Sequence, residues 1–252
     1  GINLIQLVGC LRSLVPVDVL EVVILRLMRV GVEILYETDR LPDKGRKDQE
    51  QEKEILRDIN LVIEDKSFVI ITGPNGGGKT TLARVIAGLR EGAEGEIWLD
   101  GQRIDGLDIT GRARAGLGYA FQQPVRFKGV TVEELMQMAA GEKCSREELC
   151  KLLSQVGLCA RDYLGREVGN GLSGGEIKRV EIATVLARKP RAAVFDEPEA
   201  GIDLWSFDKL IQVFGDRDRW PGALVLISHQ RRLMEIADTI GVVCQGRLAD
   251  IG

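Results

Sequence analysis

Short apolar runs alternate with segments of helical spacing along most of the chain. The strand-like runs read ILRDINLVIED, SFVIITG, EIWLDG, GLGYAF, AAVFDE, ALVLIS and IGVVCQ. The helix-like segments fall between them, notably at 131–140, 145–156, 173–189 and 203–214. Several runs are apolar at nearly every position, as in strands that are covered on both faces. This alternation predicts an α/β domain around a mostly parallel sheet.

Three segments depart from the alternation. Residues 131–172 show helical patterns and no clear strand, so we expect a helical insert there. Residues 39–54 are almost wholly charged or polar and predict a solvated loop. Residues 1–27 are apolar but interrupted by charges, whereas a membrane-spanning helix needs about 20 mostly uncharged residues. They are either an extension foreign to the domain or an amphipathic helix that docks elsewhere, which leaves 28–252 as a single domain.

Composition narrows the class of protein. The 252 residues are 44% hydrophobic and 29% charged, which is typical of a soluble globular chain with a sizeable core. A net charge of −4 argues against nucleic acid as a partner. The five cysteines, without a CxxC pair, predict reduced thiols and a cytoplasmic location. The alternative is an iron–sulfur site at Cys144, Cys150 and Cys159, whose spacing matches no ferredoxin-like pattern.

The stretch GPNGGGKTT, residues 73–81, fits the phosphate-binding pattern GxxxxGK[ST]. It follows the strand-like FVIIT and opens a helix, so backbone N–H groups and the helix dipole can surround phosphates. Lys79 would reach the β- and γ-phosphates, and the Thr80 hydroxyl would hold Mg²⁺. The expected nucleotide-binding residues are Gly73, Pro74, Asn75, Gly76, Gly77, Gly78, Lys79, Thr80 and Thr81.

The stretch RAAVFDEPEAGID, residues 191–203, is an apolar strand that ends in two carboxylates. Asp196 is placed to contact Mg²⁺, directly or through water. Glu197 could polarise a water for attack on the γ-phosphate. The alternative is an ordinary exit from a strand to a loop, where acids are common.

A second glycine-rich turn, GLSGGEIKR at 171–179, also leads into a helix. Ser173, Gly174 and Gly175 would expose backbone N–H groups as a second anion site, or would simply cap the helix. One chain seldom needs two phosphate cradles for one nucleotide. We therefore expect each cradle to serve a different molecule of a dimer.

The order GPNGGGKTT, FQQP, LSGGE, VFDEP, GID and SH resembles the nucleotide-binding subunit of an ATP-binding cassette (ABC) ATPase, over roughly residues 54–252. The resemblance implies a P-loop NTPase fold: a RecA-like core with a mostly parallel sheet, an antiparallel β portion and a helical subdomain. It further implies that two cassettes form an ATP-dependent homodimer around two ATP molecules with Mg²⁺.

The resemblance also implies residue roles. Gly73 to Thr81 correspond to the Walker A loop, and Asp196 and Glu197 to the Walker B pair. The signature corresponds to Ser173, Gly174, Gly175 and Glu176. Asp203 corresponds to the D-loop that crosses the dimer, so ATP is held by both copies.

Three more positions are assigned in the same way. Gln122 corresponds to the glutamine that contacts Mg²⁺ and links the nucleotide state to a partner, although Gln123 lies beside it. His229, the only histidine, corresponds to the switch histidine that contacts the γ-phosphate; by itself it could equally be a packed core residue. Tyr36 is a weak candidate for the aromatic residue that stacks on adenine, since a plain strand tyrosine has the same pattern.

Among ABC ATPases, the chain resembles the subunit of SUF-type iron–sulfur cluster assembly. The similar segments are SGGEIKR, RAGLGYAFQQPVRFKGVTVEEL and DYLGREVGNGLSGGE, whereas DEPEAGID and Gln123 depart from that subfamily. The implied partner is a soluble SUF scaffold protein of the SufB or SufD type. The alternative partner is a transporter transmembrane subunit on another chain. A non-hydrolytic clamp ranks below both, because Glu197 and His229 are present.

Overall fold

Strands that are buried on both faces form the centre of the molecule. The computed structural model describes residues 31–41, 53–90, 93–141, 144–169 and 171–252, with no side-chain description for 31–55, 93 and 94. One sheet has the order β10-β9-β3-β8-β7-β6, in which β9 to β6 run parallel and β10 is antiparallel. Its strands are β3 (Phe68–Thr72), β6 (Leu117–Ala120), β7 (Ala192–Asp196), β8 (Ala223–Ile227), β9 (Thr239–Cys244) and β10 (Arg247–Ile251).

Alternate side chains of these strands enter two separate cores. Phe68 and Ile70 of β3 point to one face, whereas Val69 and Ile71 point to the other. The same alternation holds in β7, where Phe195 and Val194 belong to different cores. This is the two-residue period of a strand with apolar neighbours on both sides, and it explains the continuous apolar runs of the sequence.

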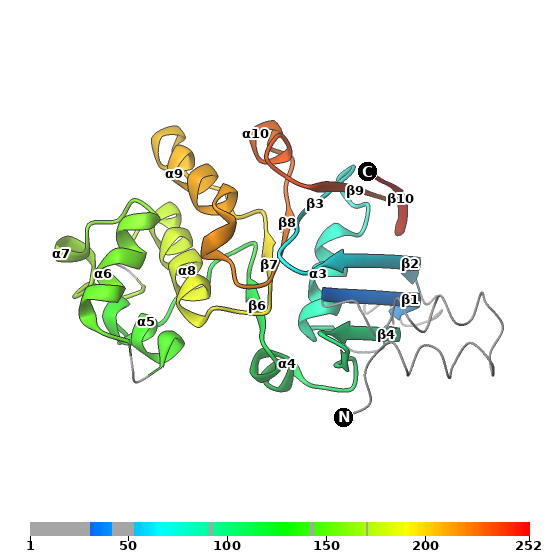
Figure 1. Ribbon diagram of the computed structural model, residues 1–252, viewed down its shortest axis with the longest axis horizontal. Helices are drawn as coiled ribbons and strands as arrows, with labels where there is room; N and C mark the ends of the chain where they lie inside the picture. The colour runs from blue at the N-terminus through cyan, green and yellow to red at the C-terminus, as the bar shows by residue number, and fades with distance from the viewer. Residues whose placement is uncertain (1–30, 42–52, 91–92, 142–143, 170) are drawn as a thin grey trace, which may run out of the picture.

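A second, antiparallel sheet covers one side of the molecule, and helix α3 lies between the two sheets (Figure 1). Its order is β2-β1-β4-β5. The strands are β1 (Gly31–Leu41), β2 (Lys53–Glu64), β4 (Ala93–Leu99) and β5 (Gln102–Arg103). Leu82, Val85 and Ile86 of α3 (Lys79–Ala87) pack in one core with residues of β2 and β4. Burial of this helix therefore fixes the loop that precedes it.

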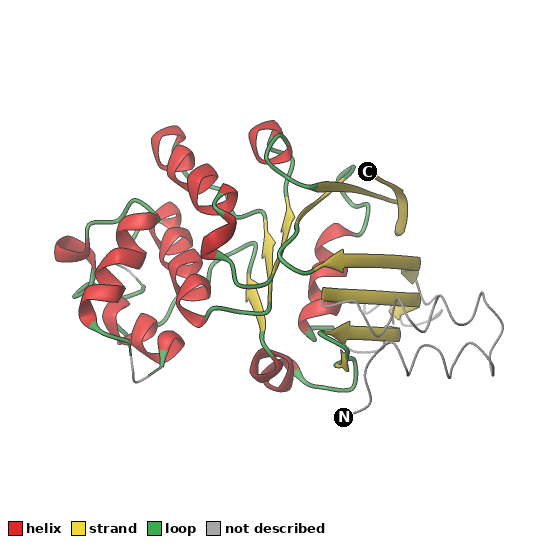
Figure 2. Cartoon of the chain, in the orientation of Figure 1, coloured by secondary structure: helices red, strands yellow, loops and turns green. Residues whose placement is uncertain are grey.

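The remaining helices gather mainly on the other face of the parallel sheet (Figure 2). They are α4 (Ile109–Ala115), α5 (Val132–Ala140), α6 (Arg146–Gln155), α7 (Ala160–Tyr163), α8 (Gly174–Arg188), α9 (Leu204–Gly215) and α10 (Arg231–Met234), with a 3-10 helix at Arg217–Arg219. Thr131, Ser145 and Ser173 each begin a helix with a capping box, in which the hydroxyl accepts from the third helical N–H. Helices α5 to α7 fall within 131–172.

The expected P-loop fold, with a mostly parallel sheet and an antiparallel β portion, is confirmed by this arrangement. The prediction of a loop over 39–54 is wrong at both ends. Residues 39–41 belong to β1 and 53–54 to β2, and the register pairs Arg40 with Glu54 and Leu41 with Lys53. Backbone pairing continues into charged sequence because a strand that is open on one face needs no apolar side chain there. Residues 42–52, and 1–27, lie outside the described residues.

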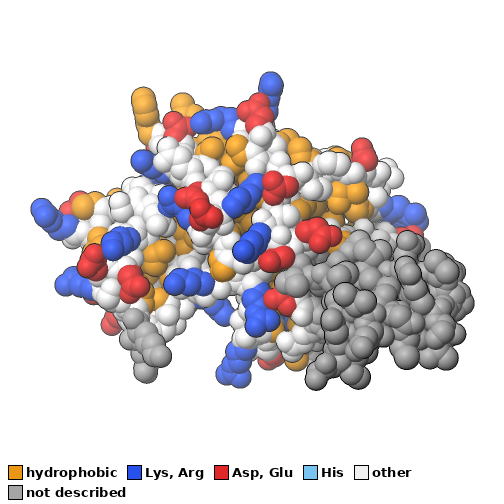
Figure 3. All heavy atoms as spheres, viewed as in Figure 1, with side chains coloured by type: hydrophobic (Ala, Val, Ile, Leu, Met, Phe, Trp, Pro, Cys, Tyr) orange, Lys and Arg blue, Asp and Glu red, His pale blue; other side chains and the backbone are white. Residues whose placement is uncertain are grey.

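Charged side chains of both signs are interspersed on the face shown in Figure 3, over the helices and the sheet. No basic patch gathers on the described part of this face.

Candidate active site

Four loops that carry the sequence motifs meet at one edge of the parallel sheet. Strands β3, β8, β7 and β6 are neighbours, so their carboxyl ends lie side by side. These ends lead into the glycine-rich loop, His229, the Asp196–Glu197 pair and Gln122. In open α/β sheets this edge is where ligands bind.

The glycine-rich loop is shaped by backbone that other residues adopt poorly. Gly73, Gly76 and Gly78 have φ values of 133°, 75° and 107°. A Cβ atom on Gly73 would lie 2.1 Å from the carbonyl oxygen of Val243 in β9. The loop is also held by Gly246, whose N–H donates to the Gly77 carbonyl at 2.9 Å. Only glycine permits this close approach at Gly73.

Lys79 closes the loop on itself. Its ammonium donates to the carbonyl oxygens of Gly73 at 2.8 Å and Pro74 at 2.9 Å. Burial lowers the pKa of Lys79, and the nearby carboxylates of Glu197 and Asp196 oppose that shift. A buried ammonium at the mouth of a loop of inward N–H groups is a strong attractor for phosphate oxygens.

One carboxylate oxygen of Asp196 accepts a hydrogen bond and the other is unsatisfied. The Thr80 hydroxyl donates to Oδ1 at 3.3 Å, whereas Oδ2 is buried without a hydrogen-bond partner among the described residues. Burial raises the pKa of Asp196, and the bond from Thr80 counters part of this shift. A hydroxyl beside an unsatisfied carboxylate oxygen is the hard oxygen donor set that Mg²⁺ prefers, so the residues fit that ion.

Glu197 is held in a strained conformation. Its φ is 47°, in the left-handed region that side chains other than glycine rarely adopt. Its N–H donates to the Ile227 carbonyl at 3.0 Å, and its Oε2 accepts from the Gln122 amide at 2.9 Å. Strain of this kind is typical of functional sites, where surrounding contacts enforce it.

His229 is not a packed core residue, so the structural alternative considered for it in the sequence is excluded. Its side chain is exposed at the end of β8, with Nδ1 3.5 Å from the Thr72 hydroxyl. The preceding Ser228 is buried; its hydroxyl donates to Glu199 Oε1 at 2.5 Å and accepts from the Gln230 N–H. Burial raises the pKa of Glu199, a carboxyl group that sequence reasoning did not single out. Glu199 thus anchors the loop of His229.

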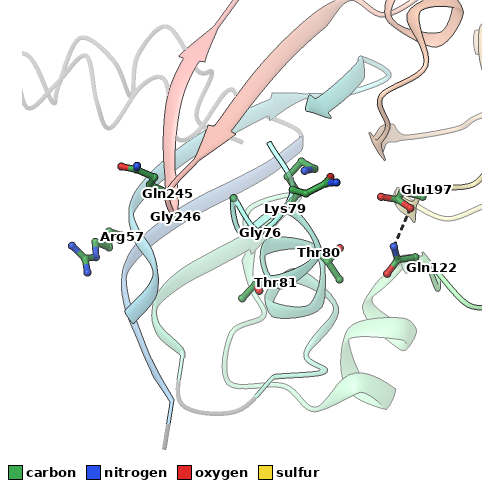
Figure 4. A pocket seen from close by; sticks show the side chains of 12 residues that line it. Arg57, Gly76, Lys79, Thr80, Thr81, Gln122, Glu197, Gln245 and Gly246 are labelled. Carbon is green, nitrogen blue, oxygen red and sulfur yellow. Dashed lines mark hydrogen bonds between the residues drawn. The ribbon is translucent and has the colours of Figure 1, made fainter. Parts of the chain in front are cut away.

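A cavity of about 800 Å³ is lined by most of the glycine-rich loop together with Glu197 and Gln122, whereas the predicted site residues Gly73, Pro74, Asp196 and His229 are not among its lining residues. Figure 4 shows Arg57, Gln245 and Gly246 at one end, the Gly76 to Thr81 segment in the middle, and Glu197 with Gln122 at the other. The lining residues are Arg57, Asn75, Gly76, Gly77, Gly78, Lys79, Thr80, Thr81, Gln122, Glu197, Gln245 and Gly246. Sequence analysis missed Arg57, Gln245 and Gly246, because no local motif marks β2 or the turn between β9 and β10.

The signature turn lies outside this cavity. Ser173 caps α8, and its N–H donates to Glu176, which also accepts from the Tyr163 hydroxyl at 2.5 Å. A Cβ atom on Gly175 would lie 2.7 Å from the Gly201 carbonyl oxygen, so this turn packs on the loop after β7. Asp203 caps α9 by accepting from Ser206 N–H at 2.9 Å. Neither Asp203 nor residues 173–176 line the cavity of their own chain.

Two other candidates receive no support from side-chain geometry. Tyr36 lies in β1, and its side chain is outside the described residues. Cys144, Cys150, Cys159 and Cys244 are free thiols, whereas Cys10 is not described. Within the described ranges, no group of three or more His, Cys, Asp or Glu side chains could hold a metal ion.

Comparison with known proteins decides the family. A family model described as ABC transporter matches residues 56–200, more than half of the chain. The chain belongs to this family. It is an ATPase of the ATP-binding cassette type, as its motifs implied, and ATP is its nucleotide.

Three relatives illustrate the likeness. The "Uncharacterized ABC transporter ATP-binding protein MJ0035" of Methanocaldococcus jannaschii is 37% identical over 79% of this chain and 83% of its own length. The "Probable ATP-dependent transporter ycf16" of Cyanidium caldarium is 30% identical over 86% of this chain and 92% of its own. A dimeric post-hydrolysis structure of the cassette MJ0796, bound to ADP and Pi, superposes with a TM-score of 0.74 at 25% identity, covering 88% of this chain and 97% of that one.

In the part of the chain that the structure describes, none of the helices is both long and apolar enough to cross a bilayer.

Gly73→Ala tests the packing of the loop on β9. The added methyl group would meet the Val243 carbonyl oxygen, and the backbone would be strained by about 1–3 kcal/mol. We expect ATP affinity to fall at least about tenfold, since 1.4 kcal/mol corresponds to that factor, as measured by titration with a fluorescent ATP analogue. Gly165→Ala is the control, because nothing lies within 4 Å of a Cβ atom there. Equal affinity in both variants would contradict the packing argument.

Proposed function

We propose that the chain is the nucleotide-binding subunit of an ABC transporter, and that ATP hydrolysis in its cavity drives a transmembrane subunit carried on another chain. The observation that carries the proposal is the hydrogen bond between Gln122 and Glu197. It joins the carboxylate best placed for hydrolysis to a segment that leads directly into the helical region. The names of the relatives from Methanocaldococcus and Cyanidium support a transporter role. ATP supply and free thiols favour the cytoplasmic side of the membrane.

The proposed chemistry assigns one task to each group at the sheet edge. Lys79 neutralises charge on the β- and γ-phosphates, together with the N–H groups of residues 73–81. Thr80, Asp196 and Gln122 would hold Mg²⁺, which when bound would supply electrostatic stabilisation of the transferred phosphoryl group. Glu197 accepts a hydrogen bond from the attacking water and polarises it. His229 donates to the γ-phosphate from the adjacent strand end.

The signature and the D-loop act in the other copy of the chain. Ser173, Gly174, Gly175, Glu176 and Asp203 do not line the cavity of their own chain, and the family resemblance implies that these motifs contact the ATP of a second copy. We therefore propose an ATP-dependent homodimer, in which each signature helix directs its N-terminus to the partner's nucleotide. The dimeric MJ0796 cassette with ADP and Pi supports this arrangement.

We propose that residues 28–252 form a single domain, and that a conformational change at the ATP cavity is transmitted to the partner through the helical subdomain at 131–172. Phe127 N–H donates to the Val168 carbonyl at 2.6 Å, which joins the segment after Gln122 to that subdomain. Beside it is a groove of about 150 Å³, here called the apolar groove. It includes Phe121, Val125, Phe127, Leu135, Val168 and Val180. Val125 and Phe127, which both line this groove, are 42% and 40% exposed. We propose that an apolar helix of the transmembrane subunit docks here.

The second candidate is the ATPase of SUF-type iron–sulfur cluster assembly, with a soluble SufB- or SufD-type scaffold in the place of the transmembrane subunit. It is favoured by the signature SGGEIKR and by the RAG before the glutamine loop, both of which resemble that subfamily. The family match and the names of the relatives favour the transporter over this second candidate.

Co-expression with the products of neighbouring genes, followed by purification through the tagged chain, tests the partner. A transporter predicts a partner that stays bound only in detergent, whereas a soluble complex without detergent would replace the transporter with the SUF role.

Phe127→Asp should abolish co-purification and leave the ATPase rate of the isolated chain within about twofold, since Phe127 does not line the ATP cavity. Ile109→Asp, at an equally exposed apolar position on α4 outside the groove, is the control. Retained binding in Phe127→Asp would exclude the groove as the docking site.

Glu197→Gln should reduce ATP turnover about 10²- to 10⁴-fold, the range expected for loss of a general base. ATP affinity should be retained, because the amide keeps the shape and the hydrogen bond from Gln122 is replaceable. Steady-state phosphate release and analogue binding measure the two quantities. Glu235→Gln, at an exposed residue beyond α10, should behave as wild type. Unchanged turnover in Glu197→Gln would remove this residue from its proposed role.

His229→Ala should lower kcat at least about tenfold, a change equivalent to 1.4 kcal/mol. The free energy of unfolding should change by less than about 0.5 kcal/mol, because the imidazole is exposed. Denaturant unfolding and phosphate release separate the two effects. The neighbouring Gln230→Ala keeps the N–H bond to Ser228 and serves as the control. A fully active His229→Ala variant would leave the histidine without a role in hydrolysis.

A further inference from the structure

Lys178, one turn into the signature helix α8, carries a cation that is almost completely buried. Its side chain is 1% exposed. The ammonium donates to three main-chain carbonyl oxygens, those of Phe121, Gln122 at 3.2 Å and Asp196 at 3.4 Å. Burying an ammonium is unfavourable unless its donors are matched, and here all three acceptors lie at the ends of strands β6 and β7.

Glu181, one turn further along α8, also contacts Phe121, but at the backbone N–H rather than at the carbonyl oxygen. Its Oε1 accepts from the Phe121 N–H at 3.0 Å, and its Oε2 lies 3.6 Å from the Lys178 ammonium. Burial raises the pKa of Glu181 and lowers that of Lys178, and the mutual attraction of the two groups opposes both shifts. The backbone of Phe121 is therefore held at its N–H by Glu181 and at its C=O by Lys178.

The contacted residues are those that the proposed chemistry uses. Gln122 follows Phe121 directly and donates to Glu197, and Asp196 precedes Glu197. The helix that carries the pair begins at Ser173, in the turn proposed to face the ATP of the second copy. Lys178 and Glu181 thus connect the signature helix with the ends of β6 and β7, the strands that lead to the proposed Mg²⁺ ligands Gln122 and Asp196.

We infer that Lys178 and Glu181 form a positioning clamp, which ties the signature helix to the backbone of Gln122 and Asp196 and sets the geometry for hydrolysis. The inference rests on the roles proposed for Gln122 and Asp196. A clamp of this kind is more than a device for stability, because a buried ion pair is often replaceable by neutral side chains at little cost in folding free energy. Stability and activity should consequently separate when both charges are removed.

Hydrogen exchange in the nucleotide-free protein tests the clamp without reference to catalysis. The variants are Lys178→Met, Glu181→Gln and the double variant. We expect the amides of residues 120–123 to exchange at least about tenfold faster in Glu181→Gln and in the double variant, because the Phe121 N–H loses its charged acceptor. Lys151→Met with Glu147→Gln removes an exposed ion pair from α6 and is the matched control. Unchanged exchange at 120–123 would overturn the clamp whatever the function of the protein.

Hydrolysis and unfolding together separate positioning from packing. Lys178→Met leaves a buried carboxylate unpaired and three carbonyl oxygens without their donor, so it should lower the unfolding midpoint. The double variant should recover the part of this loss that is due to the carboxylate. We expect the double variant nevertheless to have a kcat about 10- to 100-fold below wild type, since small displacements of catalytic groups have effects of this size. Its KM for ATP should stay within about twofold, because the phosphate loop is untouched. Half-maximal activity should require more Mg²⁺.

The outcomes are distinguishable from failure of the proposed function. A double variant that recovers both stability and full kcat would show that the pair only fills the core, which overturns the inference. If Lys178→Met does not fold, the double variant alone still decides between the two results. If substitution of Gln122 and Asp196 leaves the ATPase rate unchanged, the proposed chemistry is wrong. Hydrogen exchange at residues 120–123 would still test the contact of Lys178 and Glu181 with this segment.

Discussion

Burial of both faces of the parallel sheet is the constraint on which the rest of the structure depends. Successive side chains of β3, β7 and β8 enter two different apolar cores, and polar residues occur only at the last position of β3 (Thr72) and of β7 (Asp196). Chemistry can begin only at the residue where each strand leaves the sheet. The parallel order brings these exits together, so Asp196, His229 and Gly73 become neighbours although far apart in the chain.

The same burial places charge where water cannot screen it. Asp196 and Lys79 are both buried, and each has its pKa shifted against ionisation by desolvation. Glu197 is kept at a φ of 47° by its hydrogen bond to the end of β8. These features cost folding free energy locally and are tolerated because the two cores on either side fix the strand ends. A site prepared in this way needs little rearrangement when charge develops on a phosphate.

Local pattern was sufficient for the parallel strands and for the motif residues, because both depend on neighbours in sequence. It failed where tertiary contacts decide. Helix α4 reads ITGRARA and shows no apolar face, yet Arg112 is buried and donates to the carbonyls of Val85 and Ile86 at the end of α3. Strand β10 is mostly exposed and lies at the edge of its sheet beside β9, so its run RLADI has no apolar period. Arg57 and Gln245 enter the cavity from opposite ends of the chain, which no spacing rule could indicate.

The buried pair on α8 lies between two surfaces that must communicate if hydrolysis is to do work. Phe121 and Glu181 line the apolar groove as well as taking part in the clamp, whereas Gln122 lines the ATP cavity. A partner that presses on the groove therefore touches the peptide next to Gln122 and the acceptor that holds it. Packed interiors shift between discrete arrangements rather than deforming continuously. Displacement of Phe121 would thus change the positions of Gln122, Asp196 and the start of α8 together, which makes this segment a direct physical link between the proposed docking groove and the ATP cavity.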